Sequence, residues 1–213
     1  MTFPYGRFPH RRLRRMRRDG FSRRLAREHQ LSADDLILPV FILDGSKAVR
    51  PVSSMPGVSR RSVDELLPIV ERALTLGIPA IALFPVIEPA LKTPGAEEAF
   101  NPDGLVARCI REVKARFPEI GIVSDIALDP YTSHGQDGLI DASGYILNDE
   151  TIAVLEKQAL THASAGVDIV APSDMMDGRG GALRRALDGG GRGRRTLSRA
   201  ARCRNAPGFA LRF

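Results

Sequence analysis

The chain has few cysteines and no long apolar run, and these two absences exclude several classes of protein. The two cysteines, Cys109 and Cys203, lie far apart, which disfavours the disulfide framework of small secreted domains. No apolar run approaches the roughly 20 residues of a membrane span, and none follows the arginine-rich start as it would in a secretory signal. The sequence therefore predicts a cytoplasmic protein without a membrane partner.

Acidic residues are scarce at the two ends of the chain, where arginines gather instead. The 213 residues carry a formal net charge of +6, but residues 179–213 hold ten arginines and a single acid, Asp188. A second cluster runs from Arg11 to Arg27, while the chain without residues 179–213 is mildly acidic. Nucleic-acid binding is the alternative that such clusters suggest. Aromatic platforms for stacking bases are too sparse among these arginines, so we expect no nucleic-acid partner.

Short apolar runs alternate with amphipathic stretches through the middle of the chain. Strands are expected at residues 36–43, 79–86, 121–128 and 167–172, and helices at 62–76, 103–117, 149–165 and about 180–187. Continuously apolar strands in repeated strand–helix order predict an α/β protein with a parallel sheet and right-handed crossovers. No Gly-x-Gly-x-x-Gly follows the first strand, so a (β/α) barrel is favoured over a dinucleotide-binding fold.

The most informative segment is residues 124–138, where an apolar run leads directly into an acidic loop. Asp125, Asp129 and Asp137 bring three like charges together, and their repulsion requires a cation, a protonated partner or water. Mg²⁺ is a hard cation that suits such carboxylates. The connection between Asp129 and Tyr145 is long for a strand–helix loop, which predicts a lid or metal loop, with a hydrated polar loop as the alternative.

Polar or aromatic residues also stand at the ends of two other expected strands. Phe84 lies near the end of the second strand and Ser173 follows the fourth, and in barrels such residues meet at one face. Ser173 lacks a Gly-x-Ser-x-Gly elbow, which disfavours a serine hydrolase. Asp177 suits a helix start and a catalytic role equally well. His134 is assigned a turn role, with metal binding as the alternative, and His162 a structural role in a helix.

Several motifs together resemble the porphobilinogen synthase family, also called delta-aminolevulinic acid dehydratase. The motifs are Arg-Leu-Arg-Arg at 12–15, DLILPVF at 35–41, SMPGV at 54–58, LFP at 83–85, the acidic loop, GY at 144–145, LND at 147–149 and APSDMMDGR at 171–179. They occur in the family's order over about residues 11–188. The resemblance implies a (β/α)8 TIM barrel and a hydro-lyase that condenses two 5-aminolevulinate molecules into porphobilinogen in tetrapyrrole and heme biosynthesis.

The resemblance also implies roles for individual residues. It makes Asp125 and Ser173 catalytic, Asp129 and Asp137 metal-binding, and Ser173 and Phe84 substrate-binding. It further implies a homo-oligomer of the octamer type, joined through the N-terminal arm, residues 1–34.

The metal is expected to be Mg²⁺, or no catalytic metal at all. Zinc-dependent members of the family carry three cysteines at the positions of Ala127, Asp129 and Asp137. This chain therefore resembles the branch that replaced thiolates by carboxylates, and zinc is not expected.

The chain departs from the family where Schiff-base lysines are expected. Its lysines, Lys47, Lys92, Lys114 and Lys157, all lie upstream of that region, and Arg202 stands where the first lysine would be. A guanidinium that stays protonated is a poor nucleophile. Residues 35–188 supply only about four strand–helix units, and residues 189–213 form an atypical Gly/Arg-rich tail. We therefore expect a truncated member, with an inactive fragment that associates with full-length subunits as the alternative function.

Overall fold

The computed structural model describes residues 6–193 and 195–197, and all structural statements below concern this part of the chain. The first five residues of the predicted arm, Arg202, Cys203 and most of the predicted tail lie outside the described residues. No helix of the described part is long and apolar enough to cross a bilayer.

A parallel sheet organises the protein, and its main strands are neighbours in the order in which the chain makes them. The strands are β1 (Ile37–Leu43), β2 (Val49–Pro51), β3 (Ser59–Arg61), β4 (Ala80–Val86), β5 (Gly121–Ile126), β6 (Ile169–Pro172) and β7 (Thr196–Leu197). The order across the sheet is β2-β3-β1-β4-β5-β6-β7, and only β2 pairs antiparallel, with β3. Because β1, β4, β5, β6 and β7 follow one another without reversal, right-handed crossovers put every connecting helix on the same face, as in a barrel.

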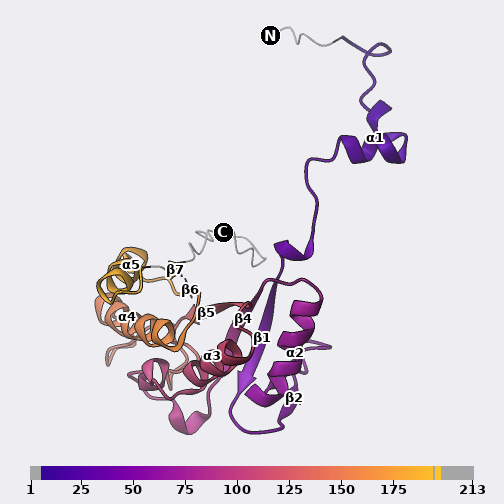
Figure 1. Ribbon diagram of the computed structural model, residues 1–213. Coiled ribbons are helices and arrows are strands. Elements are labelled where there is room, and N and C mark those ends of the chain that lie inside the picture. The colour runs from indigo at the N-terminus through magenta and orange to yellow at the C-terminus, as the bar shows by residue number, and fades with distance from the viewer. Residues whose placement is uncertain (1–5, 194, 198–213) are drawn as a thin grey trace.

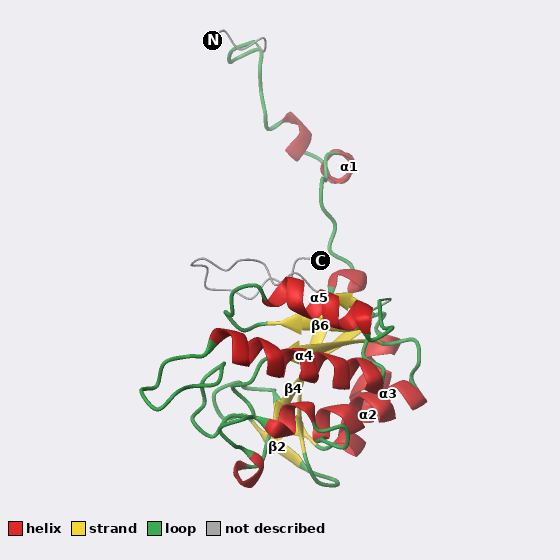
Figure 2. Ribbon diagram, turned by 90° about the vertical axis from the view of Figure 1, so that its left-hand side faces the viewer, coloured by secondary structure: helices red, strands yellow, loops and turns green. Residues whose placement is uncertain are grey.

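Helices α2 to α5 line the outer face of this sheet, whereas α1 lies apart from it on the N-terminal arm (Figures 1 and 2). The α-helices are α1 (Gly20–Leu25), α2 (Val63–Thr75), α3 (Leu105–Arg116), α4 (Asn148–Ala165) and α5 (Arg179–Gly189). The 3-10 helices are η1 (Arg15–Arg17), η2 (Ala33–Asp35), η3 (Pro89–Leu91) and η4 (Glu97–Phe100). The four predicted strand–helix units are confirmed with boundary changes of one to two residues.

The ends of α2 show which local signals acted as predicted. Gly77 follows the helix with φ +77°, the left-handed conformation that glycine adopts at little cost. Ser62 stands at the N-cap position but makes no cap hydrogen bond. Its buried hydroxyl instead accepts a 2.9 Å hydrogen bond from the backbone N–H of Ala48, so tertiary packing took the side chain that was expected to cap the helix.

The two faces of the sheet differ in what they bury. Alternate side chains on the outer face, such as Ile42, Ile81 and Ile122, are fully buried in the main core against the helices. The inner face carries a much smaller apolar cluster around Ala82, Val123 and Ala171. Side chains alternate along a strand, so every second residue of β5 and β6 faces the interior of the barrel-like sheet.

Three short strands, β2, β3 and β7, are new relative to the sequence prediction, and β7 lies in the predicted tail. Thr196 and Leu197 of β7 pair in parallel with Ile169 and Val170 of β6, so the beginning of the predicted tail continues the sheet. A two-residue strand is too short to show any periodicity in the sequence. Its register depends on tertiary contacts, including the hydrogen bond from the backbone N–H of Thr196 to the carbonyl of Asp168.

Residues 6–32 extend away from the rest of the chain (Figure 1). Apolar side chains along this arm are exposed, among them Leu13 at 73% and Leu25 at 78%. Ser22 is buried within the arm itself, where its hydroxyl donates to the Met16 and Asp19 carbonyls. This part of the chain therefore has local structure while its apolar side chains lack cover in the monomer.

Candidate functional site

The two residues expected to be catalytic lie next to each other at the carboxyl edge of the sheet. Asp125 on β5 is in register with Ala171 on β6, and Ser173 lies two residues beyond, on the same face. The Ser173 hydroxyl donates a 2.6 Å hydrogen bond to Oδ1 of Asp125. Residues 48 positions apart in the sequence therefore form one polar pair.

Burial is the main influence on the Asp125 carboxyl, and it raises the pKa of this group to about 6. The nearby negative charges of Asp129 and Asp174 act in the same direction, whereas the Ser173 hydrogen bond lowers the pKa. At pH 7 about one carboxyl in ten is then protonated. A group with a pKa this close to neutrality can accept a proton and return it, as general acid–base catalysis requires.

The negative charge of one predicted metal ligand, Asp137, acts on the other, Asp129. Burial and the charge of Asp137 raise the pKa of Asp129, while the positive charge of Lys92 opposes the rise. Lys92 owes this position to the backbone beside it, because Thr93 forms a bridge with Thr132 in the acidic loop. Asp137 therefore lies close enough to Asp129 to raise its pKa, and Lys92, which the sequence analysis had not connected with them, acts on the same carboxyl.

The described residues hold no group of three or more histidine, cysteine, aspartate or glutamate side chains arranged to bind a metal. Asp129 and Asp137 offer two carboxylates, which is fewer than the four ligands of a structural zinc site but is compatible with a Mg²⁺ ion that keeps several waters. Cys109 is buried, and burial raises the pKa of its thiol to about 12, so it is not a thiolate ligand at neutral pH.

Asp174, which the sequence analysis included only within the APSDMMDGR motif, follows β6 at the same edge. Its carboxyl is buried, accepts a 2.7 Å hydrogen bond from the backbone N–H of Met176, and lies 3.2 Å from Nε of Arg179. The Arg179 contact is an ion pair without hydrogen-bond geometry, and Oδ2 of Asp174 has no hydrogen-bond partner. Burial raises the pKa of Asp174, and the Met176 hydrogen bond and the Arg179 charge lower it.

His134 and Asp177 each had two alternative roles in the sequence analysis. Nδ1 of His134 accepts a hydrogen bond of 3.2 Å from the backbone N–H of Gln136, which is the turn role. Its Nε2 is buried without a hydrogen-bond partner, and His134 belongs to no group of three potential metal ligands among the described residues. Asp177 does not cap α5, because Gly178 stands at its N-cap; its backbone N–H instead donates to Oδ1 of Asn148.

Phe84 lies where the substrate contact was expected, at the carboxyl half of β4. Its half-buried ring packs on the inner-face cluster with a centroid 5.8 Å from that of Phe41 on β1. The two rings are in register across β1 and β4. Together they give the acidic edge an apolar neighbour.

The chain's four lysines all lie within the described residues. Lys92 acts on Asp129, whereas the Lys114 ammonium lies 2.6 Å from the Asp168 carboxylate, before β6 begins and at the opposite end of the sheet. Lys47 and Lys157 are exposed, the former after β1 and the latter on α4. No lysine of this chain lies on β5, on β6 or in the segment from Asp168 to the end of the sequence.

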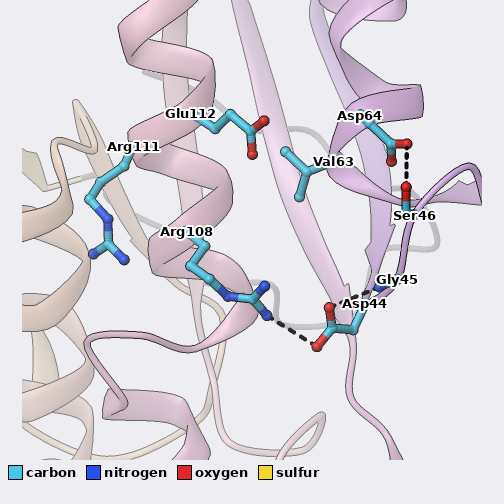
Figure 3. A pocket seen from close by; sticks show the side chains of 8 residues that line it. All are labelled: Asp44, Gly45, Ser46, Val63, Asp64, Arg108, Arg111 and Glu112. Atoms are coloured by element: carbon cyan, nitrogen blue, oxygen red, sulfur yellow. Dashed lines mark hydrogen bonds and ion pairs between the residues drawn. The ribbon is translucent and has the colours of Figure 1, made fainter.

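A separate cavity of about 510 Å³ lies on the outer side of the sheet, between the segment after β1, the start of α2, and α3 (Figure 3). None of the predicted site residues lines it. Arg108 forms a 3.1 Å ion pair with Asp44, and the Asp64 carboxylate accepts hydrogen bonds from Ser46 and the backbone of Lys47. Most charges of this cavity are therefore used within the protein, and the acidic edge is the better candidate site.

Comparison with known sequences identifies the relatives of the chain. The family model described as delta-aminolevulinic acid dehydratase matches residues 10–202. The delta-aminolevulinic acid dehydratase of Bradyrhizobium diazoefficiens is 54% identical over 180 residues, which are 84% of this chain and 51% of that protein. That of Rhodobacter capsulatus is 48% identical over 184 residues, which are 86% of this chain and 55% of that protein. The chain thus spans about half the length of the curated relatives it matches.

A solved structure agrees with the sequence relatives. The delta-aminolevulinic acid dehydratase of Toxoplasma gondii, in complex with the reaction product porphobilinogen, superposes with a TM-score of 0.86 and 43% sequence identity. The match covers 90% of this chain and 56% of the other. The predicted barrel family is confirmed, and the sheet described above corresponds to part of that barrel.

Proposed function

Since the chain belongs to the delta-aminolevulinic acid dehydratase family, we propose that its acidic edge serves the condensation of two 5-aminolevulinate molecules into porphobilinogen with loss of two waters. The observation that carries this proposal is the Ser173–Asp125 hydrogen bond together with the pKa of about 6 at Asp125. Forming a pyrrole from two amino ketones requires repeated proton transfers at carbon, nitrogen and oxygen. Asp125 is suited to these transfers because both of its protonation states are populated near neutral pH.

Each site residue then has a distinct task. Ser173 orients the Asp125 carboxyl and presents its hydroxyl oxygen to substrate, while the Phe84 ring excludes water from one side. Asp129 with Lys92 places opposite charges beside the pair, where they suit the amino and carboxylate groups of 5-aminolevulinate. These residues bind, orient and move protons, which is the share of the reaction that this chain's own groups support.

The strands that carry Asp125 and Ser173 hold no carbonyl-activating amine. The family resemblance implies Schiff-base lysines, and none of the chain's four lysines lies on the strands that carry Asp125 and Ser173. Arg202, at the position of the first expected lysine, lies outside the described residues and does not act as an amine nucleophile. We therefore propose that this polypeptide binds substrate and product at the acidic edge but does not condense 5-aminolevulinate by itself.

The alternative function is a non-catalytic subunit that associates with full-length family members. The exposed apolar side chains of the arm support such an association. We propose that the arm mediates it in a homo-oligomer of the octamer type, and that the protein resides in the cytoplasm. We also propose Mg²⁺ as the cation of Asp129 and Asp137, with water completing its coordination; it would offset the repulsion of the two carboxylates.

Binding of porphobilinogen tests the proposal directly. Isothermal titration of the full chain should give binding that Asp125→Asn and Ser173→Ala each weaken by about tenfold or more, because each removes a polar partner of the ligand. Asp103→Asn is the matched control, since Asp103 is exposed on another surface. Unchanged affinity in both site variants would place the ligand elsewhere. Absence of binding by the unmodified chain would instead favour the subunit alternative, which mixed oligomers with a full-length relative would then have to support.

A further inference from the structure

Helix α4 carries three buried polar side chains, and each of them is bonded to β5 or to the loop that follows it. These residues are Thr151, Gln158 and His162, with exposures of 0%, 0% and 2%. Gln158 and His162 are four positions apart and lie on the same helix face. The stripe faces the segment of the chain that carries Asp125, Asp129 and Asp137.

His162 contacts β5 on the helix-facing side of the sheet, opposite the candidate site. Its Nδ1 and the hydroxyl of Ser124 share a hydrogen bond of 2.5 Å, and both side chains are buried. Burial lowers the pKa of His162 to about 4, so the ring is neutral at pH 7. Successive side chains of a strand point to opposite faces, so a hold on Ser124 from the helix side sets the direction of Asp125 on the inner side.

Gln158 contacts the backbone just after the end of β5. Its Nε2 donates a 3.3 Å hydrogen bond to the carbonyl oxygen of Ala127, two residues after Asp125. Its Oε1 is buried without a hydrogen-bond partner. Burial raises the pKa of the neighbouring Tyr131 hydroxyl, and the Gln158 amide opposes the rise, although no hydrogen bond of ordinary geometry joins the two side chains.

Thr151 holds the far end of the loop. Its hydroxyl oxygen accepts a 3.0 Å hydrogen bond from the backbone N–H of Leu139, two residues after Asp137, and the hydroxyl donates to the carbonyl of Leu147. The three contacts are spaced along residues 124–139. They hold this segment at its first residue, Ser124, near its start at Ala127, and at its last residue, Leu139.

Filling a core with polar side chains costs more free energy than filling it with apolar ones. An unpartnered buried amide oxygen carries a desolvation penalty that an apolar side chain of similar volume avoids. Hydrogen bonds are directional, so they fix the position of the backbone more closely than apolar packing does. We propose that Thr151, Gln158 and His162 are positioning residues, which hold the acidic loop from the helix side and thereby set the geometry of Asp125 and its partners.

This inference deepens the proposed function, on which it rests, and it assigns a task to a helix that contributes no side chain to the site. The test compares Gln158→Met and His162→Phe with Leu155→Ala, a control that opens a cavity on the same helix without removing a polar contact. Urea unfolding measures stability, ¹³C NMR titration of the carboxyl measures the Asp125 midpoint, and calorimetry measures porphobilinogen affinity.

We expect both polar-to-apolar variants to move the Asp125 midpoint from about 6 towards its ordinary value, because a loosened strand end admits water. Porphobilinogen affinity should fall about tenfold. Leu155→Ala should lower the unfolding midpoint and leave both readouts unchanged. His162→Asn should retain the Asp125 midpoint of the unmodified chain, because an asparagine amide places a hydrogen-bonding atom where Nδ1 of the ring lies.

Several results would overturn the positioning role. One is that Leu155→Ala changes the Asp125 midpoint as much as the polar variants do; another is that His162→Asn behaves like His162→Phe. If His162→Phe does not fold, Ser124→Ala removes the same bond from the strand side with the loss of one oxygen, and an unchanged midpoint there also overturns the role. Failure of the unmodified chain to bind porphobilinogen would contradict the proposed function alone, because the Asp125 titration still decides the positioning role.

Discussion

Oδ1 of Asp125 accepts a 2.6 Å hydrogen bond from the hydroxyl of Ser173, across the neighbouring strands β5 and β6. The bond stabilises the ionised carboxylate, while burial and two neighbouring aspartates disfavour it. The balance of these effects sets the protonation of the site, and it leads to four predictions besides the tests described above.

The first prediction concerns stability and pH. The Asp125 pKa is raised from 3.8 to about 6 in the folded protein, so the folded state binds a proton more tightly than the unfolded state. Stability from this group is therefore greatest below pH 4 and is lost as the pH rises through 6. Asp125→Asn should be more stable than the unmodified chain at pH 8, by about 1–3 kcal/mol, and this advantage should vanish near pH 3.5. Urea unfolding of both chains at several pH values measures the difference; a constant difference across the range would contradict the raised pKa.

The second prediction concerns the hydroxyl of Ser173. Ser173→Ala removes a donor that lowers the Asp125 pKa, so the midpoint of Asp125 should move above about 6. A ¹³C NMR titration of the carboxyl carbon follows this midpoint. Ser133→Ala, an exposed serine in the acidic loop, serves as the control and should leave it unchanged. A fall of the midpoint in Ser173→Ala would show that the hydroxyl is not its donor in solution.

The third prediction concerns the buried ion pair of Asp174 and Arg179. Arg179→Gln leaves the Asp174 carboxylate buried without its counter-charge and should cost about 3–5 kcal/mol of unfolding free energy. Adding Asp174→Asn should recover part of the loss, because it removes the unpaired charge. Arg108→Gln, which breaks the half-exposed pair with Asp44, should cost less than about 1 kcal/mol. Chemical unfolding measures all three, and equal costs for the two arginine variants would refute the special role of burial.

The fourth prediction concerns the cation. Two carboxylates without thiolate or imidazole partners should bind Mg²⁺ weakly and should not select Zn²⁺. The Mg²⁺ heat in calorimetry should disappear in the Asp129→Asn, Asp137→Asn double variant and persist in Asp141→Asn, whose carboxylate is engaged in its own turn. Lack of Mg²⁺ binding by the unmodified chain would favour the alternative without a catalytic metal, with Lys92 as the counter-charge of Asp129.

Much of the architecture is readable from local pattern because it depends on local chemistry. The runs of apolar residues predicted β1, β4, β5 and β6 to within two residues at each end. Glycines with positive φ mark the ends of α2 and α4, at Gly77 and Gly166, where the left-handed conformation is required. The two-residue strand β7 was missed because its place depends on pairing with β6 and not on its own periodicity.

The sequence predicted residues of the candidate site but not the contacts between them. Asp125, Asp129, Asp137, Phe84 and Ser173 were chosen from strand ends and from family resemblance. Asp174 is part of the APSDMMDGR motif at the end of the fourth expected strand, but an aspartate beside a serine does not reveal that it is buried. The sequence assigned His162 a structural role, and only its 2.5 Å contact with Ser124 connects it with the acidic loop.

The sequence by itself determined the four main strand–helix units, the parallel order and the family, because periodicity, turn residues and motif spacing are local properties of the chain. It also determined which lysines are present. Only the tertiary structure decided that Ser173 reaches Asp125, that Lys92 opposes the charge of Asp129, and that α4 holds the acidic loop. These relationships depend on strand register and on the alternation of side chains across a sheet, where a shift of one residue would turn Asp125 from the site into the core.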